Sequence, residues 1–199
     1  MIIEDLEQNT PAWLEWRKSG IGCSEVAAIC GVNPFCTALE VYNEKVGLTK
    51  KKKNAAMQRG QDFEKEALSV FEMQMGVKDH YKPVCAVHDE RNYLKASIDG
   101  YCKKTNTLVE LKVPNRIVMD MAKAGSLPLY YMYQVQAELM ITKAEKAYFA
   151  CYSPDTFEIY VVVVEPDAFI KWNILSHTEN FYTCHLIPRV PPEKERSKK

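Results

Sequence analysis

The sequence predicts an α/β protein, with a central mixed β-sheet flanked by helices. Helical patterns fill residues 10–76, and segments with the alternation of strands follow between 82 and 113. Further helical patterns, two apolar strands and a last helix come after them. Helices on both sides of strands indicate a sheet that helices cover. We see no internal repeat, so we expect one domain over residues 1–188 and a charged, flexible C-terminal tail over 189–199.

Two short helices are expected first. Thr10 and Pro11 are typical of an N-cap followed by proline at the first helical position, and this helix ends near Gly20. Ser24 can cap a second helix that runs to Gly31.

Two more helices precede the strands. Thr37 and Glu40 have the spacing of a capping box, and Gly47 closes that helix. A long helix is predicted from about Asn54 to residue 75, with Gly76 as its stop.

Strands are expected at residues 82–88, 93–102 and 107–113. Only Lys-Lys-Thr-Asn separates the last two, which favours an antiparallel hairpin. After Pro114 ends the hairpin, the pattern predicts further elements in the order helix, helix, strand, strand, helix at 116–124, 129–142, 146–152, 157–164 and 166–184.

Composition excludes several classes of protein. The seven cysteines are irregularly spaced without a C-x-x-C, which argues against a disulfide framework or a zinc ribbon and favours free thiols. The chain contains no apolar run long enough to span a bilayer, and its acidic start lacks the features of a signal peptide. We therefore expect a cytoplasmic protein without a membrane partner. The net charge is zero, so any grip on nucleic acid must be local; the basic run Lys50–Lys53 is either a solvated loop or a phosphate contact.

The hairpin carries the first candidate chemistry. On the strand at 107–113, Glu110 and Lys112 share a face with Leu108, while Val109 and Leu111 point to the other side. Taken alone, this arrangement fits a solvent-facing ion pair of little energetic value.

The preceding strand changes that interpretation. If Cys102 pairs with Thr107, then Asp99 faces Glu110, and Ser97 faces Lys112. Two opposed carboxylates destabilise a sheet unless a positive charge lies between them, and Mg²⁺ is a natural occupant.

Two further features bear on this site. An ammonium at Lys112 can orient a metal-bound water and offset charge in the transition state. Asp99-Gly100 is also a dipeptide typical of a turn or a bulge, and both roles are compatible.

Two helices supply further polar groups. Glu64 lies within the apolar stripe of the long helix, where it is either capped locally or part of the metal site. On the helix at 129–142, apolar side chains cluster around Gln136, so we expect Gln136 to face inward and Gln134 outward. Gln136 then either makes a core hydrogen bond or positions water or phosphate.

An Asp on one strand followed by Glu-x-Lys on the next resembles the PD-(D/E)xK nuclease superfamily, whose fold is restriction-endonuclease-like. Further segments narrow the resemblance to the phage lambda exonuclease family, also called YqaJ-type viral recombinases. These segments are WRKSGIGCSEV at 16–26, Arg59-Gly60-x-x-Phe63-Glu64, Ser97-Ile98-Asp99-Gly100 and Tyr133-Gln134-Val135-Gln136. The resemblance covers residues 10–165, with Ile98 in place of the superfamily's proline.

The resemblance implies a 5′-to-3′ exonuclease that acts on double-stranded DNA ends and releases mononucleotides. It implies two Mg²⁺ ions per site, with Mn²⁺ able to substitute, and a role in phage or prophage recombination. The 3′ overhang would pass to a single-strand annealing protein. A homotrimer ring around the DNA would explain how a chain without net charge holds its substrate.

Residue by residue, the resemblance places the metal ligands at Asp99, Glu110 and the backbone carbonyl of Leu111. It assigns the catalytic lysine, helix glutamate and glutamine to Lys112, Glu64 and Gln136. The pocket for the 5′-phosphate falls on three residues, Arg17, Ser24 and Ser97.

Three alternatives stay open at this point. An endonuclease of restriction or repair type would use the same fold. An iron–sulfur nuclease would need a cysteine cluster that the sequence lacks. A DNA-end-binding protein without activity is disfavoured because the five polar residues of the pattern are all present.

Overall fold

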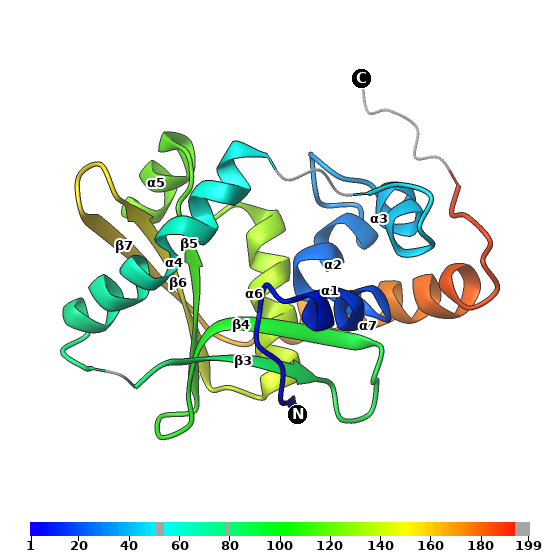
Figure 1. The fold of residues 1–199 in the computed structure, drawn as a ribbon, viewed down its shortest axis with the longest axis horizontal. Coiled ribbons are helices and arrows are strands. Elements are labelled where there is room, and N and C mark those ends of the chain that lie inside the picture. Colours follow the sequence, from blue (N-terminus) through cyan, green and yellow to red (C-terminus); the bar gives the residue numbers. More distant parts are fainter. Residues whose placement is uncertain (51–53, 79, 194–199) are drawn as a thin grey trace.

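The computed structural model describes residues 1–50, 54–78 and 80–193. Within these ranges the backbone forms a mixed seven-stranded sheet with helices packed on it, which confirms the predicted α/β class (Figure 1). Lys51–Lys53 of the basic run and residues 194–199 of the predicted tail lie outside the described residues. No helix in the described part of the chain has the length and apolar character needed to cross a membrane.

The sheet is built on the predicted hairpin. Its strands lie in the order β1 (Ile2–Glu4), β3 (Lys82–Val87), β4 (Leu94–Cys102), β5 (Thr107–Lys112), β6 (Lys146–Ser153) and β7 (Glu158–Val164), and β2 (Ile21–Gly22) pairs with β4. The pairs β5–β6 and β2–β4 are parallel, and the others are antiparallel. β1 and β2 were not predicted, because three and two residues are too few for an alternating pattern.

The helices begin where side chains can cap them. They are α1 (Pro11–Lys18), α2 (Cys23–Ile29), α3 (Ala38–Lys45), α4 (Ala55–Gln74), α5 (Arg116–Lys123), α6 (Leu129–Thr142) and α7 (Ala168–Phe181), followed by a π-helical turn at Tyr182–Leu186. Two predicted caps are confirmed: Thr10 accepts a hydrogen bond from the backbone N–H of Trp13, and Thr37 accepts one from that of Glu40. At the predicted start of the long helix, Asn54 accepts the backbone N–H of Met57. The predicted last helix is shorter than expected, because Asp167 caps it and its final turn widens.

One predicted cap was wrong. The helix expected to start after Ser24 begins at Cys23, with Gly22 as its N-cap. The Glu25 carboxylate accepts the backbone N–H of Gly22 at 2.8 Å, which satisfies this donor without a hydroxyl. The side chain of Ser24 is therefore free for another partner.

Two buried clusters lie on opposite sides of the sheet. The larger one joins α2, α6 and α7 to β4 and β6, and the smaller one lies beneath α4. Leu108 of β5 belongs to the first cluster, whereas Val109 and Leu111 belong to the second. Phe71 of α4 is fully buried, which contributes roughly 1.5–3 kcal/mol and holds α4 against β5.

β4 contains a bulge at Asp99–Gly100. Lys82 of β3 pairs with Tyr101, yet Val84 pairs with Ile98, so β4 has one extra residue there. The strand then bends and runs beside β5 (Figure 1), while Tyr101 still pairs with Lys82 of β3. Because a bulge redirects side chains, this one changes the direction in which Asp99 points. The predicted turn or bulge at this dipeptide is thereby confirmed as a bulge.

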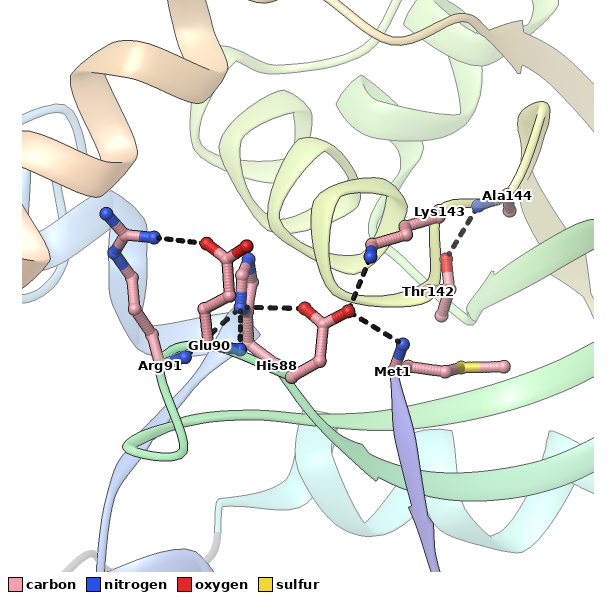
Figure 2. A network of polar contacts seen from close by, with 8 residues as sticks. Met1, His88, Glu90, Arg91, Thr142, Lys143 and Ala144 are labelled. Atoms are coloured by element: carbon pink, nitrogen blue, oxygen red, sulfur yellow. Dashed lines mark hydrogen bonds and ion pairs between the residues drawn. The ribbon is translucent and has the colours of Figure 1, made fainter.

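A polar network ties the end of α6 to the connection between β3 and β4 (Figure 2). Lys143 adopts a left-handed conformation after α6 (φ 57°), and its ammonium contacts the Asp89 carboxylate. That hydrogen bond is the main reason why the pKa of Asp89 falls to about 2. On the same connection, the backbone N–H groups of Glu90 and Arg91 donate to Nδ1 of His88.

Candidate active site

The β4–β5 hairpin places Asp99 at the mouth of a cleft. The predicted register is confirmed from Cys102–Thr107 to Gly100–Val109, where the ladder ends. One residue further, Oδ2 of Asp99 accepts the backbone N–H of Leu111 at 2.8 Å, so a side chain replaces the next hydrogen bond of the ladder. Burial, together with the negative charge of Glu110, raises the pKa of Asp99 well above its usual range.

The predicted pairing of Ser97 with Lys112 was wrong. Ser97 pairs with Cys85 of β3, but on its other side the β4–β5 ladder already ends at Gly100–Val109, so Ser97 does not pair with Lys112. Ser97 and Lys112 nevertheless line the same cleft, together with Asp99 and Glu110. The bend in the hairpin therefore brings the predicted site residues into one cleft, although the two strands do not stay paired along their whole length as the sequence suggested.

Glu110 is a buried carboxylate with one satisfied oxygen. Its side chain lies on β5 and is 2% exposed. Oε1 contacts the Lys112 ammonium and accepts a hydrogen bond from Nε2 of Gln134 at 2.5 Å. Oε2 has no partner among the described residues. A buried carboxylate oxygen without a partner is unfavourable and marks a place for a bound cation or water.

Lys112 is held in its charged form. Burial alone would lower the pKa of its ammonium, but the nearby carboxylates of Glu110 and Asp99 outweigh burial and raise it. Lys112 thus supplies the positive charge between the carboxylates in this structure, and it remains a proton donor at neutral pH.

Glu64 of α4 lines the same cleft, as the apolar stripe predicted. Burial and the charge of Glu110 raise the pKa of its carboxyl group. Three carboxylates from α4, β4 and β5 therefore gather around Lys112.

The expected outward orientation of Gln134 on α6 was wrong, whereas Gln136 is buried and makes internal hydrogen bonds, which was one of its two expected roles. Gln134 faces the cleft, where its Nε2 donates to both Glu110 and Glu138. Gln136 lies on the other side, donating to the carbonyl of Glu165 at 2.7 Å and accepting the N–H of Asp167 at 2.8 Å. The apolar pattern misled because every residue from Tyr133 to Thr142 is buried, so α6 has no solvent face in this stretch.

Glu138 also lines the cleft, although the sequence pattern did not predict it. It lies one turn after Gln134, is 0% exposed, and accepts a hydrogen bond from Nε2 of that residue at 2.9 Å. Its Oε2 has no partner among the described residues. Burial, followed by the charge of Glu110, raises its pKa well above the usual range. An acidic residue inside the apolar run of α6 was the available signal.

Arg17, Ser24 and Ser97 line the same cleft as the carboxylates. Nη2 of Arg17 donates to Oγ of Ser24 at 3.0 Å, and the guanidinium lies 4.8 Å from the centroid of the Trp13 ring. Nε1 of Trp13 donates to Oγ of Ser97 at 2.9 Å. The three residues predicted to bind phosphate thus form one connected group, with Trp13 as an unpredicted member.

Two buried lysines fix the end of α1 that carries Arg17. Nζ of Lys95 donates to the carbonyl of Trp16 at 2.6 Å, and Nζ of Lys45 donates to that of Arg17 at 2.8 Å. Cations are favourable at the C-terminus of a helix, where carbonyls lack partners. Lys45 also forms a buried ion pair with Glu25 at 2.8 Å, so α1, α2 and α3 are locked around the cleft.

The donor set fits a hard cation that keeps part of its water shell. In the described part of the chain, no three Asp, Glu, His or Cys side chains are grouped as a ready metal site. Mg²⁺ needs only one or two carboxylates, because waters and phosphate oxygens complete its six positions. Asp99 and Glu110, with its unpartnered Oε2, meet that requirement.

The fold and the cleft define a mixed α/β protein that carries several carboxylates and Lys112 in one cleft. The YqaJ-like viral recombinase domain model matches residues 12–145, and the chain belongs to this family. The protein YqaJ of Bacillus subtilis is 27% identical over 154 residues, which cover 75% of this chain and 48% of that protein. A protein of African swine fever virus is 28% identical over 171 residues, covering 68% and 46% of the two chains. The chain thus spans about half the length of these relatives.

Solved structures share the fold. The alkaline exonuclease LHK-Exo of Laribacter hongkongensis superposes with a TM-score of 0.70 at 23% identity, covering 86% of this chain and 90% of that one. A phage-related exonuclease of Haemophilus somnus gives a TM-score of 0.58 at 14% identity, covering 82% and 93%.

Proposed function

We propose that this protein is a metal-dependent exonuclease that degrades double-stranded DNA from 5′ ends and releases mononucleotides. The observation that carries the proposal is the shared cleft, where Asp99, Glu110 and Lys112 lie together with the Arg17–Ser24 pair. Membership of the viral recombinase family supports DNA as the substrate. The relatives with this fold that are described as exonucleases, one of them solved with dAMP, support the reaction class.

The metal would be Mg²⁺, with Mn²⁺ able to substitute, and we propose two ions per site. The ligands of this metal centre would be Asp99, Glu110 and the backbone carbonyl of Leu111. When bound, Mg²⁺ polarises a phosphate oxygen and makes its water a stronger nucleophile at neutral pH.

The remaining chemistry belongs to this chain's own side chains. Lys112, kept protonated by the adjacent carboxylates, offsets the negative charge that develops on the phosphate. Gln134 holds the Glu110 carboxylate in place through its amide. Glu64 faces the same space from α4 and can accept a proton from the attacking water.

Arg17, Ser24 and Ser97 would bind the terminal 5′-phosphate. A guanidinium suits a phosphate because it offers several donors in one plane, and the two hydroxyls add weaker contacts. Because this group and Asp99 line one cavity of about 190 Å³, a bound end would present its first internucleotide phosphate to Lys112. That arrangement supports the release of single nucleotides.

The proposed setting is recombination in the cytoplasm of a bacterial host. The 3′ overhang left by the reaction would be the substrate of a single-strand annealing protein. We also propose a homotrimer ring, because an enclosed path compensates for a net charge of zero.

The test compares linear duplex DNA with covalently closed circular DNA of the same sequence, in Mg²⁺ and in EDTA. The proposal expects mononucleotides from the linear DNA in Mg²⁺, no product in EDTA and an intact circle. Cutting of the circle would contradict end-dependence and favour the alternative, an endonuclease of restriction or repair type on the same fold.

A further inference from the structure

A second groove continues from the candidate active site. It has a volume of about 680 Å³ and runs between the first turns of α4 and the start of α6. Its lining includes Gln61, Glu64, Asp99 and Lys112, which also line the first cleft. The shared residues therefore lie where the two cavities meet, whereas Arg17 lines only the first one.

Three aromatic rings lead from Lys112 into this groove. The ammonium lies 5.2 Å from the centroid of the Tyr131 ring, and the Tyr131 and Tyr130 centroids are 4.4 Å apart. The Phe35 ring stands edge-on to Tyr130 at 5.5 Å and 84°. Phe35, Tyr130 and Tyr131 thus form a continuous aromatic wall, which we call the aromatic groove.

Packing in the protein interior does not explain why a phenylalanine occupies position 35. Its side chain is 78% exposed, whereas a phenylalanine that stabilises a core is buried. Because the Phe35 ring meets Tyr130 edge-on, most of the surface of the Phe35 ring faces the groove and solvent. Gly60 of α4 also lines the groove and has open space where a side chain would begin, which widens the path.

We propose that the aromatic groove stacks unpaired nucleobases of the DNA strand being cleaved, on the 3′ side of the scissile phosphate. The inference rests on the proposed function, because that function places the 5′-phosphate at Arg17. A strand anchored there and cleaved beside Lys112 must continue into the second cavity. Exposed aromatic rings stack on any base, since every base has a π-face.

The proposal has a structural consequence for the DNA. Bases in a duplex are stacked on each other and do not offer a free face, so the end must open before it occupies the groove. The aromatic groove would stabilise that opened end next to the catalytic carboxylates. Stacking would serve every sequence alike, as an exonuclease requires.

The experiment measures binding without hydrolysis. A 5′-phosphorylated duplex with a short unpaired 5′ tail carries 2-aminopurine at the second nucleotide, and full-length protein is added in EDTA. A second DNA has an abasic site at that position and a dye far from it, so that anisotropy reports its affinity. The proteins compared are wild type, Phe35→Ala and the control Phe169→Ala, which removes an exposed ring of α7 outside both cavities.

The expected results are quenching of 2-aminopurine by wild type and by Phe169→Ala, but not by Phe35→Ala. Phe35→Ala should bind the intact DNA about 5- to 150-fold more weakly, the range for one lost stacking contact, and the abasic DNA as tightly as wild type does. Equal weakening on both DNAs, or no quenching by wild type, would overturn the proposal. A change in molar mass of Phe35→Ala by light scattering would overturn it too, because the groove would then join copies of the chain.

Failure of the proposed function gives a different pattern. If base-dependent binding at Phe35 holds but Mg²⁺ produces no hydrolysis of the same DNA, base stacking in the groove stands, while the exonuclease proposal and the position relative to a scissile phosphate fall. If hydrolysis proceeds from 5′ ends but Phe35→Ala binds as wild type does, only the groove proposal falls.

Discussion

The carboxylate of Asp99 accepts the backbone N–H of Leu111 at 2.8 Å, across the gap where β4 and β5 separate. This bond fixes one oxygen of the carboxylate and brings Asp99 next to Leu111, the residue whose carbonyl is the predicted third metal ligand. Burial makes the charged form of Asp99 unfavourable, so a cation at this place would relieve the repulsion with Glu110.

The first prediction concerns these two carboxylates. Asp99→Asn and Glu110→Gln should each reduce DNA hydrolysis by at least about 100-fold, because metal catalysis contributes several kcal/mol. Neither should lower the melting temperature substantially, since each removes a negative charge from a crowded buried group. Steady-state rates and thermal melts check both parts.

The control for the Asp99 and Glu110 variants is their melting temperature with and without Mg²⁺. Mg²⁺ should raise the melting temperature of wild type, because a ligand that binds the native state stabilises it, and should not raise that of the two variants. Wild-type rates in either variant would refute the assigned site.

The second prediction concerns the bulge. A Cβ at Gly100 would lie 2.7 Å from Cγ1 of Val109 and 2.9 Å from Cβ of Tyr81, so Gly100→Ala must displace the hairpin. We expect a loss of about 1–3 kcal/mol in the free energy of unfolding, and a drop in activity because Asp99 moves with its neighbour.

Gly60→Ala is the matched control, since a Cβ there meets open space within α4. It should stabilise the protein by about 0.5–1 kcal/mol. Chemical denaturation measures both variants, and equal stability of the two would contradict the steric role of Gly100.

The third prediction separates the two glutamines of α6. Gln134→Ala should lower activity about 10- to 100-fold, the range for a residue that orients a metal ligand. Gln136→Ala should instead cost about 1–3 kcal/mol of stability, because it leaves the groups of Glu165 and Asp167 unpaired, while activity at low temperature stays near wild type. The reverse pattern would show that Gln136 acts in the site.

The fourth prediction tests the phosphate pocket. Arg17→Ala should slow degradation of 5′-phosphorylated ends about 10- to 100-fold, because a charge-assisted contact of roughly 1.5–3 kcal/mol is lost, and should affect 5′-hydroxyl ends little. Lys18→Ala, which removes an exposed cation paired with Glu15, is the control and should keep the preference. Equal losses on both kinds of end would count against the pocket.

Local signals in the sequence predicted most of the fold. The caps at Thr10, Thr37 and Asn54 have short-range causes, so each helix starts where the pattern indicated. The hairpin register followed from the four residues between its strands. Ser24 failed as a cap because the helix already begins at Cys23, which places Ser24 inside its first turn.

The rest of the site depends on contacts that periodicity does not encode. The side of α6 that faces the cleft could not be inferred, because both Gln134 and Gln136 lie within a stretch buried all round. The role of Glu138 could not be predicted, because the groups that interact with it lie on β5 and on its own helix. The bend of β4 changed the neighbours of Ser97, since a straight register assumes a flat hairpin.

The most direct test of the account is a polarity measurement on a linear duplex with a single 5′-phosphate and a different fluorophore at the 3′ end of each strand. In Mg²⁺, we expect the phosphorylated strand to shorten from its 5′ end while its label persists on ever smaller fragments, and the strand with the 5′-hydroxyl to shorten much more slowly. Early loss of the 3′ labels as free nucleotides, or internal cuts in both strands, would contradict it.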